Sequence, residues 1–226
     1  KGTAPNTQGQ PPSDHAQPPS GSMSQGQPPA GGMGGANTQS FDYTGSYTGA
    51  LTADGEEVRS DGNSVSATES DQNALLAKGD GTLVVTGASV DKSGDDNNGD
   101  NCNFYGLNSI ALSVGNGSLL KISNSKLSAT SEGSNGVFST DSATAYVRDS
   151  SITTSAGNSR GLDATYGGTI LADTLDISTQ GDHSAGVATD RGGGNISLTN
   201  STIKTAGSGS PLLYSTGDIE LNNVTG

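Results

Sequence analysis

The chain has 226 residues, of which 29% are hydrophobic and 4% aromatic, with 35 glycines and no tryptophan. A compact globular domain normally holds more apolar material, so this composition favours either disorder or an elongated repeat with a thin core of small aliphatic residues. The formal net charge of −13, with only 10 Lys and Arg, argues against nucleic acid as a partner, because few cations could neutralise phosphates. No apolar run is long enough to span a bilayer, so we expect no transmembrane segment.

The first 40 residues differ in composition from the rest. Repeated Gln-Pro-Pro with Gly and Ser favours extended polyproline-type backbone and offers almost nothing to bury, so we expect an arm or linker over residues 1–40. The stretch FDYTGSYTGAL follows, in which aromatic and small residues alternate as in a strand or hairpin. We therefore expect residues 41–72 to form an N-terminal cap.

Residues 73–226 repeat with a period of about 25 residues. An aliphatic anchor recurs in similar contexts, and after a first interval of 35 residues the intervals are 27, 25, 25 and 25. These anchors are Leu75, Ile110, Val137, Leu162, Val187 and Leu212. The first interval is longer because SGDDNNGDNCNFYG, residues 93–106, inserts a loop.

Each repeat unit reads as three short strands separated by turns. Apolar residues alternate within a unit, as at Ile170 and Ala172 and again at Leu175 and Ile177, which is the period of a strand with one buried side. A Gly precedes most second strands, and an Asn or Asp suited to a left-handed turn precedes each third strand. These marks are Asn124, Asp149, Asp173, Asn200 and Asn222. The pattern predicts an all-β chain folded as a right-handed parallel β-helix of about six coils.

The stretches NFYGLNS, SNGVFSTD, SRGLDATYGG, GDHSAGVATDRGGG and GSPLLYSTGDI resemble those of secreted β-helix proteins of anaerobic gut bacteria, which have a pectin-lyase-like fold. The similarity covers roughly residues 70–226. It implies an extracellular or cell-surface location and an adhesin-like or carbohydrate-binding role, in a family without an assigned activity.

Two consecutive coils carry more charged and aromatic residues than stacking requires. Aligning the anchors places Asp141, Tyr166 and Arg191 in one column, about 4.8 Å apart per coil, and Phe138 and Asp163 in another that faces outward. We expect a ligand-binding face formed by Arg160, Asp163, Tyr166, His183, Asp190 and Arg191. Arg pairs with carboxylates and Tyr rings can lie against sugars, so the expected partner is an extracellular glycan or a host protein. The alternative is that these side chains bond turn backbone or each other across coils.

Catalysis on the same face is a second hypothesis. Asp163, Asp190, His183 and Arg160 could supply an acid, a base and charge neutralisation for a polysaccharide hydrolase or lyase. The paired Asp-Asp and Gly-His-Gly motifs of polygalacturonases are absent, however. We therefore favour a non-catalytic adhesin-like module, with a polysaccharide-degrading enzyme and a purely structural stalk as alternatives.

The inserted loop contains DDNNGDN, residues 95–101, whose oxygen atoms are the ligands that calcium prefers. The candidate metal ligands are Asp95, Asp96 and Asp100, and the alternative is an acidic solvated loop without a metal. Cys102 is expected to pack beneath this loop. An uncapped last coil at Val224 would offer an open strand edge, so a homo-oligomer formed through that edge is a further expectation.

Overall fold

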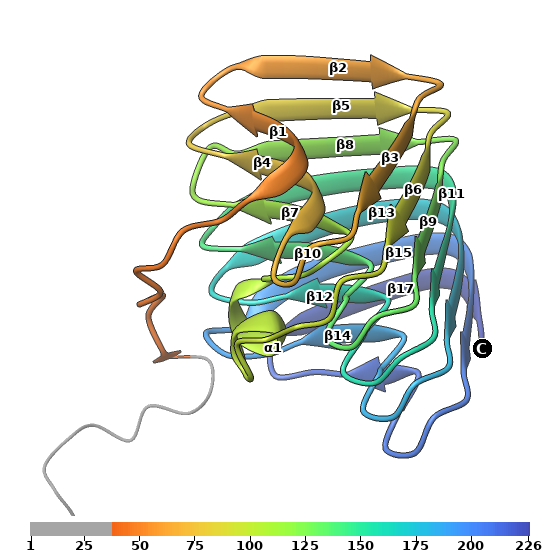
Figure 1. Cartoon of the computed structure of the whole chain (residues 1–226). Coiled ribbons are helices and arrows are strands. Elements are labelled where there is room, and N and C mark those ends of the chain that lie inside the picture. Colours follow the sequence, from red (N-terminus) through yellow and green to blue (C-terminus); the bar gives the residue numbers. More distant parts are fainter. Residues whose placement is uncertain (1–37) are drawn as a thin grey trace, which may run out of the picture. The chain divides into compact units, whose positions relative to one another are not determined.

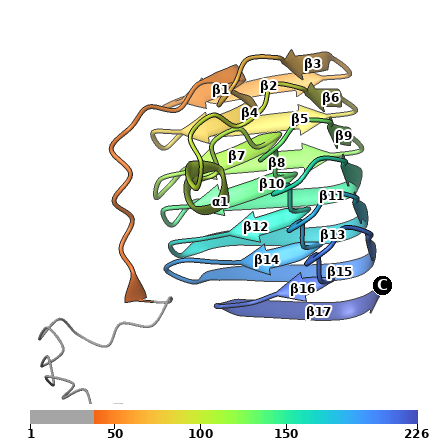
Figure 2. The same cartoon turned by 60° about the horizontal axis from the view of Figure 1, so that its bottom comes forward.

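The computed structural model describes residues 38–226. The arm predicted over residues 1–40 therefore lies almost entirely outside the described residues. The described chain is a parallel β-helix, a β-solenoid of about seven coils, as the 25-residue period predicts. Figures 1 and 2 show the coils stacked from β1–β3 at one end to β16 and β17 at the other.

One sheet, here called sheet A, takes one parallel strand from each coil. Its strands are β1 (Gly49–Asp54), β4 (Asn73–Lys78), β7 (Ala111–Val114), β10 (Val137–Thr140), β12 (Leu162–Ala164), β14 (Val187–Thr189) and β16 (Leu213–Tyr214). Its register aligns Val137 with Leu162 and Leu162 with Val187, as the anchor alignment predicts. In β7 and β16 the aligned residues are Ala111 and Leu213, one position after the predicted anchors Ile110 and Leu212.

The second sheet, sheet B, supplies the other two sides of every coil. Its strands are β2 (Glu57–Asp61), β3 (Ser64–Ala67), β5 (Thr82–Thr86), β6 (Ser89–Lys92), β8 (Leu119–Ser123), β9 (Lys126–Ala129), β11 (Thr144–Thr154), β13 (Gly168–Thr179), β15 (Gly194–Thr205) and β17 (Asp218–Thr225). The strand β11 pairs with β8 along its first half and with β9 along its second half, and the two ladders are separated at the corner by Asp149 and Ser150.

Left-handed backbone makes that corner in each coil. The corner residues are Gly62 and Gly87 in the first two coils, with φ 69° and 65°, and then Asn124, Asp149, Thr174, Asn200 and Asn223, with φ between 50° and 56°. Asn and Asp tolerate this conformation because their short polar side chains bond locally. The corner falls one residue after the predicted Asp173 and Asn222. At Thr174 the hydroxyl donates to Asp173 Oδ1 at 2.9 Å.

A thin column of aliphatic side chains runs through the coils. The alternating residues of one representative coil, Ile170, Ala172, Leu175 and Ile177, are all buried, as predicted. The residues between them point outward and are partly or fully exposed. This arrangement explains how a chain with few hydrophobic residues folds, since each coil buries only a few small side chains and shares them with its neighbours.

The β-helix begins earlier than the sequence pattern indicates. Residues 49–67 lie in the predicted cap, but β1, β2 and β3 pair in register with β4, β5 and β6 and so form the first coil. The sequence pattern did not reveal the first coil, because most residues of its strands are at least partly exposed. Only Ala53, Ser60 and Ala67 in these strands are buried. The extra coil accounts for seven coils where six were expected.

The inserted loop holds a short helix that the sequence pattern did not predict, α1 (Asn101–Tyr105), which ends at Gly106 with φ 75°. With residues 38–48, α1 packs on the outer side of sheet A (Figure 1). The apolar residues there, Leu76, Leu112, Val114 and Phe138, form a second buried cluster against Phe41 and Tyr47. Sheet A is therefore covered on this side, whereas the outer side of sheet B carries exposed side chains.

Candidate functional site

Three of the predicted ligand-binding residues form a charged cluster beneath α1. Arg160 Nη1 lies 3.5 Å from Asp163 Oδ2, and Arg160 Nη2 lies 3.6 Å from Asp190 Oδ2. The side chains of Arg160 and Asp190 are each 13% exposed, and that of Asp163 is 0% exposed. Arg160 Nη1 also donates to Asn103 Oδ1 of α1 at 2.7 Å. The cluster is thus turned toward the loop that covers it.

Asp163 is a fully buried carboxyl group beside Arg160. It follows Phe138 in the outward column, as predicted, and neither of its oxygens accepts a hydrogen bond of ordinary geometry. Burial raises the pKa of Asp163 to about 8, while Arg160 opposes the rise and Asp190 adds to it. Burial also raises the pKa of Asp190. Asp163 is therefore largely protonated at neutral pH.

Tyr166 and Arg191 contact the segments that lie over sheet A, which are α1 and residues 38–48. Tyr166, 8% exposed, stacks on Tyr105 of α1 with ring centroids 5.5 Å apart and meets Phe41 edge-on at 5.6 Å. Its N–H donates to the carbonyl of Arg191 at 2.8 Å, which confirms the predicted column. The Arg191 guanidinium lies 3.6 Å from the centroid of the Phe104 ring, a cation–π contact.

His183 is the one predicted residue that lies apart from this group. It occupies an exposed turn before β14, where its N–H donates to the carbonyl of Ser208 at 2.9 Å. Its side chain makes no hydrogen bond or ion pair within residues 38–226. The other five residues are engaged with α1, with residues 38–48 or with one another. These contacts match the alternative in which the residues serve the fold.

The candidate calcium ligands lie on the exposed part of the inserted loop and bond mainly to nearby backbone. Asp95 Oδ1 accepts from the N–H of Glu132 at 2.9 Å, and Asp96 Oδ1 accepts from the N–H of Asn98 at 3.4 Å. Asp100 Oδ1 accepts from Asn103 at 3.5 Å. Among the described residues no three His, Cys, Asp or Glu side chains are grouped so as to hold a metal ion. Calcium binding here stays a prediction.

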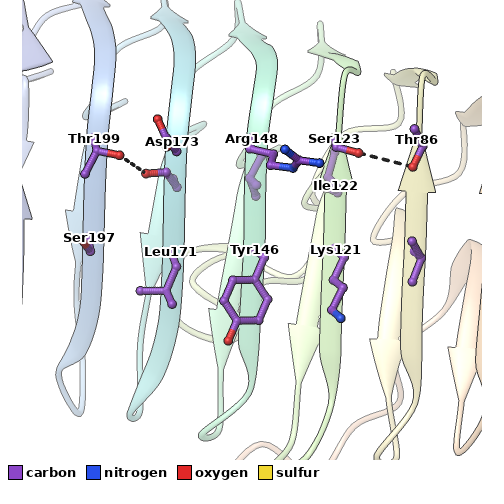
Figure 3. A pocket seen from close by; sticks show the side chains of 13 residues that line it. Thr86, Lys121, Ile122, Ser123, Tyr146, Arg148, Leu171, Asp173, Ser197 and Thr199 are labelled. Carbon is purple, nitrogen blue, oxygen red and sulfur yellow. Dashed lines mark hydrogen bonds between the residues drawn. The ribbon is translucent and has the colours of Figure 1, made fainter.

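An open groove of about 620 Å³ lies on the outer side of sheet B, over β8, β11, β13 and β15 (Figure 3). Its floor is a column of outward residues in which Tyr146 lies between Lys121 and Leu171 on the adjacent strands. Tyr146 is 42% exposed and Leu171 is 40% exposed. A second column carries Arg148, next to Ser123 on β8. The other exposed residues of the groove are mainly polar or charged, among them Lys121, Arg148 and Asp173, so Tyr146 and Leu171 are its large exposed apolar side chains.

A second groove of about 610 Å³ lies just past the corner of the same coils. It is lined by Lys126, Ser151, Asp176 and other polar residues, including the left-handed corner residues. The two grooves are adjacent along the chain, because Ser123 lines the first and Asn124 the second. Together they run along the outer side of sheet B on both sides of the corner.

The sequence signal for this groove lies in the outward residues of the second strand of each coil. In KIS, YVR and LAD the inward residue is Ile122, Val147 or Ala172, and the residues on either side point outward. The predicted site came from the turns after the anchors, where Arg and His gather. Comparing the outward residues of the second strand from coil to coil would have singled out Tyr146 and Leu171 at positions where β15 has Ser197.

Fold and surface together define a class, the parallel β-helix with one covered sheet and one open, grooved sheet. No protein-family model, curated protein or solved structure matches the chain. In the part of the chain that the structure describes, no helix has the length and apolar character needed to cross a membrane.

Proposed function

We propose that this chain is an extracellular, adhesin-like surface module that binds carbohydrate in the groove on sheet B without catalysis. The observation that supports the proposal is the exposed pair of Tyr146 and Leu171 on adjacent strands, at the floor of a groove of about 620 Å³. A tyrosine ring offers a flat apolar surface to a sugar face and a hydroxyl that can bond at its edge.

The rest of the groove complements that platform. Ser123, Ser197 and Thr199 line it and present hydroxyl groups that can exchange hydrogen bonds with sugar hydroxyls. Small-molecule sites commonly combine apolar lining with a few convergent polar groups, and this groove has both. It is open along its length, which suits a chain of sugars better than a compact ligand.

A catalytic role is the weaker alternative because of where the acidic groups lie. Asp163 has no exposed surface, and Asp190 is turned toward Arg160 under the inserted loop. An acid or base must come within hydrogen-bond reach of the bond that it cleaves. Asp173 is an acidic residue of the open groove, and its carboxylate already accepts hydrogen bonds from Asn200 Nδ2 at 3.1 Å and from the hydroxyl of Thr174.

The test is a polysaccharide panel that records both binding and released reducing ends. We expect wild-type protein to bind at least one glycan without product, and Tyr146→Ala to weaken that binding about tenfold or more, since a buried aromatic contact is lost. Tyr214→Ala is the matched control, because Tyr214 is 46% exposed and lies on sheet A outside the groove. Release of sugar would support the enzyme alternative. Absence of binding to every glycan would support a stalk.

A further inference from the structure

Cationic side chains gather on the outer side of sheet B although the chain is strongly acidic overall. Five other cations within residues 38–226 are occupied by ion pairs, by backbone carbonyls or by an aromatic ring. They are Arg59, Lys78, Lys92, Arg160 and Arg191. Of the remaining four in this part of the chain, only Arg148 forms an ion pair, and all four are exposed on strands of sheet B. They are Lys121, Lys126, Arg148 and Lys204.

Three of these four cations line the grooves. Lys121 and Arg148 line the first groove and Lys126 lines the second. Within the described residues, Lys121 and Lys126 form no hydrogen bond or ion pair. Arg148 has two carboxylates near it, Asp149 Oδ2 at 3.5 Å and Asp173 at the paired position on β13, and 69% of its side chain is exposed. The two lysines of the grooves therefore have no acceptor within the described residues, while Arg148 is exposed beside two carboxylates.

The carboxylates of the same grooves are in the opposite situation. Asp173 Oδ1 accepts hydrogen bonds from Asn200 at 3.1 Å and from Thr174 at 2.9 Å, and these bonds lower the pKa of Asp173. Asp176 Oδ1 accepts from Thr202 at 2.8 Å. The carboxylates of the grooves thus already have donors, whereas Lys121 and Lys126 lack acceptors within the described residues and Arg148 stays largely exposed, so the first groove can still take an acidic group.

We propose that the glycan bound in the first groove is acidic, with carboxylate or sulfate groups that pair with Lys121 and Arg148 while a sugar ring lies on Tyr146. This inference rests on the proposed function and names its ligand class. Lys121 and Tyr146 are paired on adjacent strands, which are about 4.8 Å apart, and Arg148 follows Tyr146 by two residues, about 7 Å along the strand. A single short run of sugars can reach all three.

The experiment compares acidic glycans with neutral forms of the same backbone. The probes are polygalacturonate against its methyl ester, for carboxylate, and dextran sulfate against dextran, for sulfate. We expect at least one acidic form to bind about tenfold more tightly than its neutral counterpart at low salt, because two exposed ion pairs contribute together, and the preference to shrink as salt rises. The double variant with Lys121→Gln and Arg148→Gln should lose the preference.

The control variant is Lys204→Gln, which removes an exposed cation from the same sheet but lies outside both grooves. It should keep the preference for the acidic form. An equal loss in Lys204→Gln would overturn the inference, because the effect would then follow net charge. Equal binding of acidic and neutral forms, lost in Tyr146→Ala, would also overturn it while leaving the proposed function intact. Binding of poly-glutamate as tight as that of the polysaccharide would overturn it in favour of an acidic protein partner. If none of these forms binds while another, neutral glycan of the panel does, the inference is overturned and the proposed function stands; if no glycan of the panel binds, the proposed function itself fails.

Discussion

Asp163 is a buried carboxyl group that makes the stability of the chain depend on pH. Its pKa is about 8 in the folded chain and about 3.9 in an unfolded chain. Between these values the folded state binds more protons than the unfolded state, so the free energy of unfolding falls as pH rises from about 4 to about 8. D163N should remove this slope. We expect it to match wild type near pH 4 and to be more stable, by on the order of a few kcal/mol, near pH 8.

Urea unfolding of both proteins at pH 4.5 and pH 8 measures this difference. Asp61→Asn is the control: Asp61 is exposed on β2 and the variant keeps Asp163, so its stability should fall between pH 4.5 and pH 8 as in wild type. A difference between D163N and wild type that is the same at both pH values would contradict the prediction.

The sequence alone predicted part of the charged cluster around Asp163. The column positions of Asp163, Tyr166 and Arg191 follow from counting residues after the anchors, and the structure confirms them. What counting could not show is that α1 and residues 38–48 lie over them, since both segments are irregular and have no repeat. The contacts of Phe41 and Tyr105 with Tyr166 are between residues more than 60 positions apart. No local pattern encodes them.

Local opening of the helix α1 can be measured through Cys102, the single cysteine of the chain. Cys102 is 2% exposed, burial raises the pKa of its thiol, and its Sγ lies 3.3 Å from the carbonyl of Gly99. A thiol reagent should therefore react only when α1 opens locally. Asn103→Ala removes the bond to Arg160, and we expect it to speed labelling about five- to tenfold, which corresponds to one lost hydrogen bond.

The measurement is the labelling rate of native protein with a chromogenic disulfide. Thr202→Ala is the control, because it removes a side-chain hydrogen bond of similar length to Asp176 on sheet B. Equal acceleration in both variants would mean that labelling follows global unfolding, and no acceleration in Asn103→Ala would mean that this bond does not hold α1.

The strands themselves were more predictable than α1, for a physical reason. Inward residues alternate with period two in every coil, so coils with strong aliphatic residues reveal themselves in sequence. The first coil was missed because Glu57, Arg59 and Asp61 make its second strand mostly exposed. The sequence pattern predicted the corner at Asp173, because Asp is a more common turn residue than Thr. In the structure the left-handed residue is its neighbour Thr174.

For the whole molecule, stability should depend on where a coil lies in the stack. Coils contact mainly their neighbours, so an inner coil has two neighbours and an end coil has one. Leu213 and Leu221 in the last coil are 42% and 37% exposed, since no strand of the described chain packs beyond β16 and β17. The homo-oligomer expected through this edge stays a prediction.

Leu162 and Leu213 allow a matched test, because both are leucines of one inward column, joined through Val187. Leu162 is fully buried, so Leu162→Ala should lower the free energy of unfolding by about 2–5 kcal/mol. Leu213→Ala leaves no enclosed cavity and should lower it by about 1 kcal/mol or less. Urea unfolding at one pH measures both values. Equal losses would mean that Leu213 is buried in solution, as it would be in a dimer formed through the last coil, and dilution of the protein would then restore the difference.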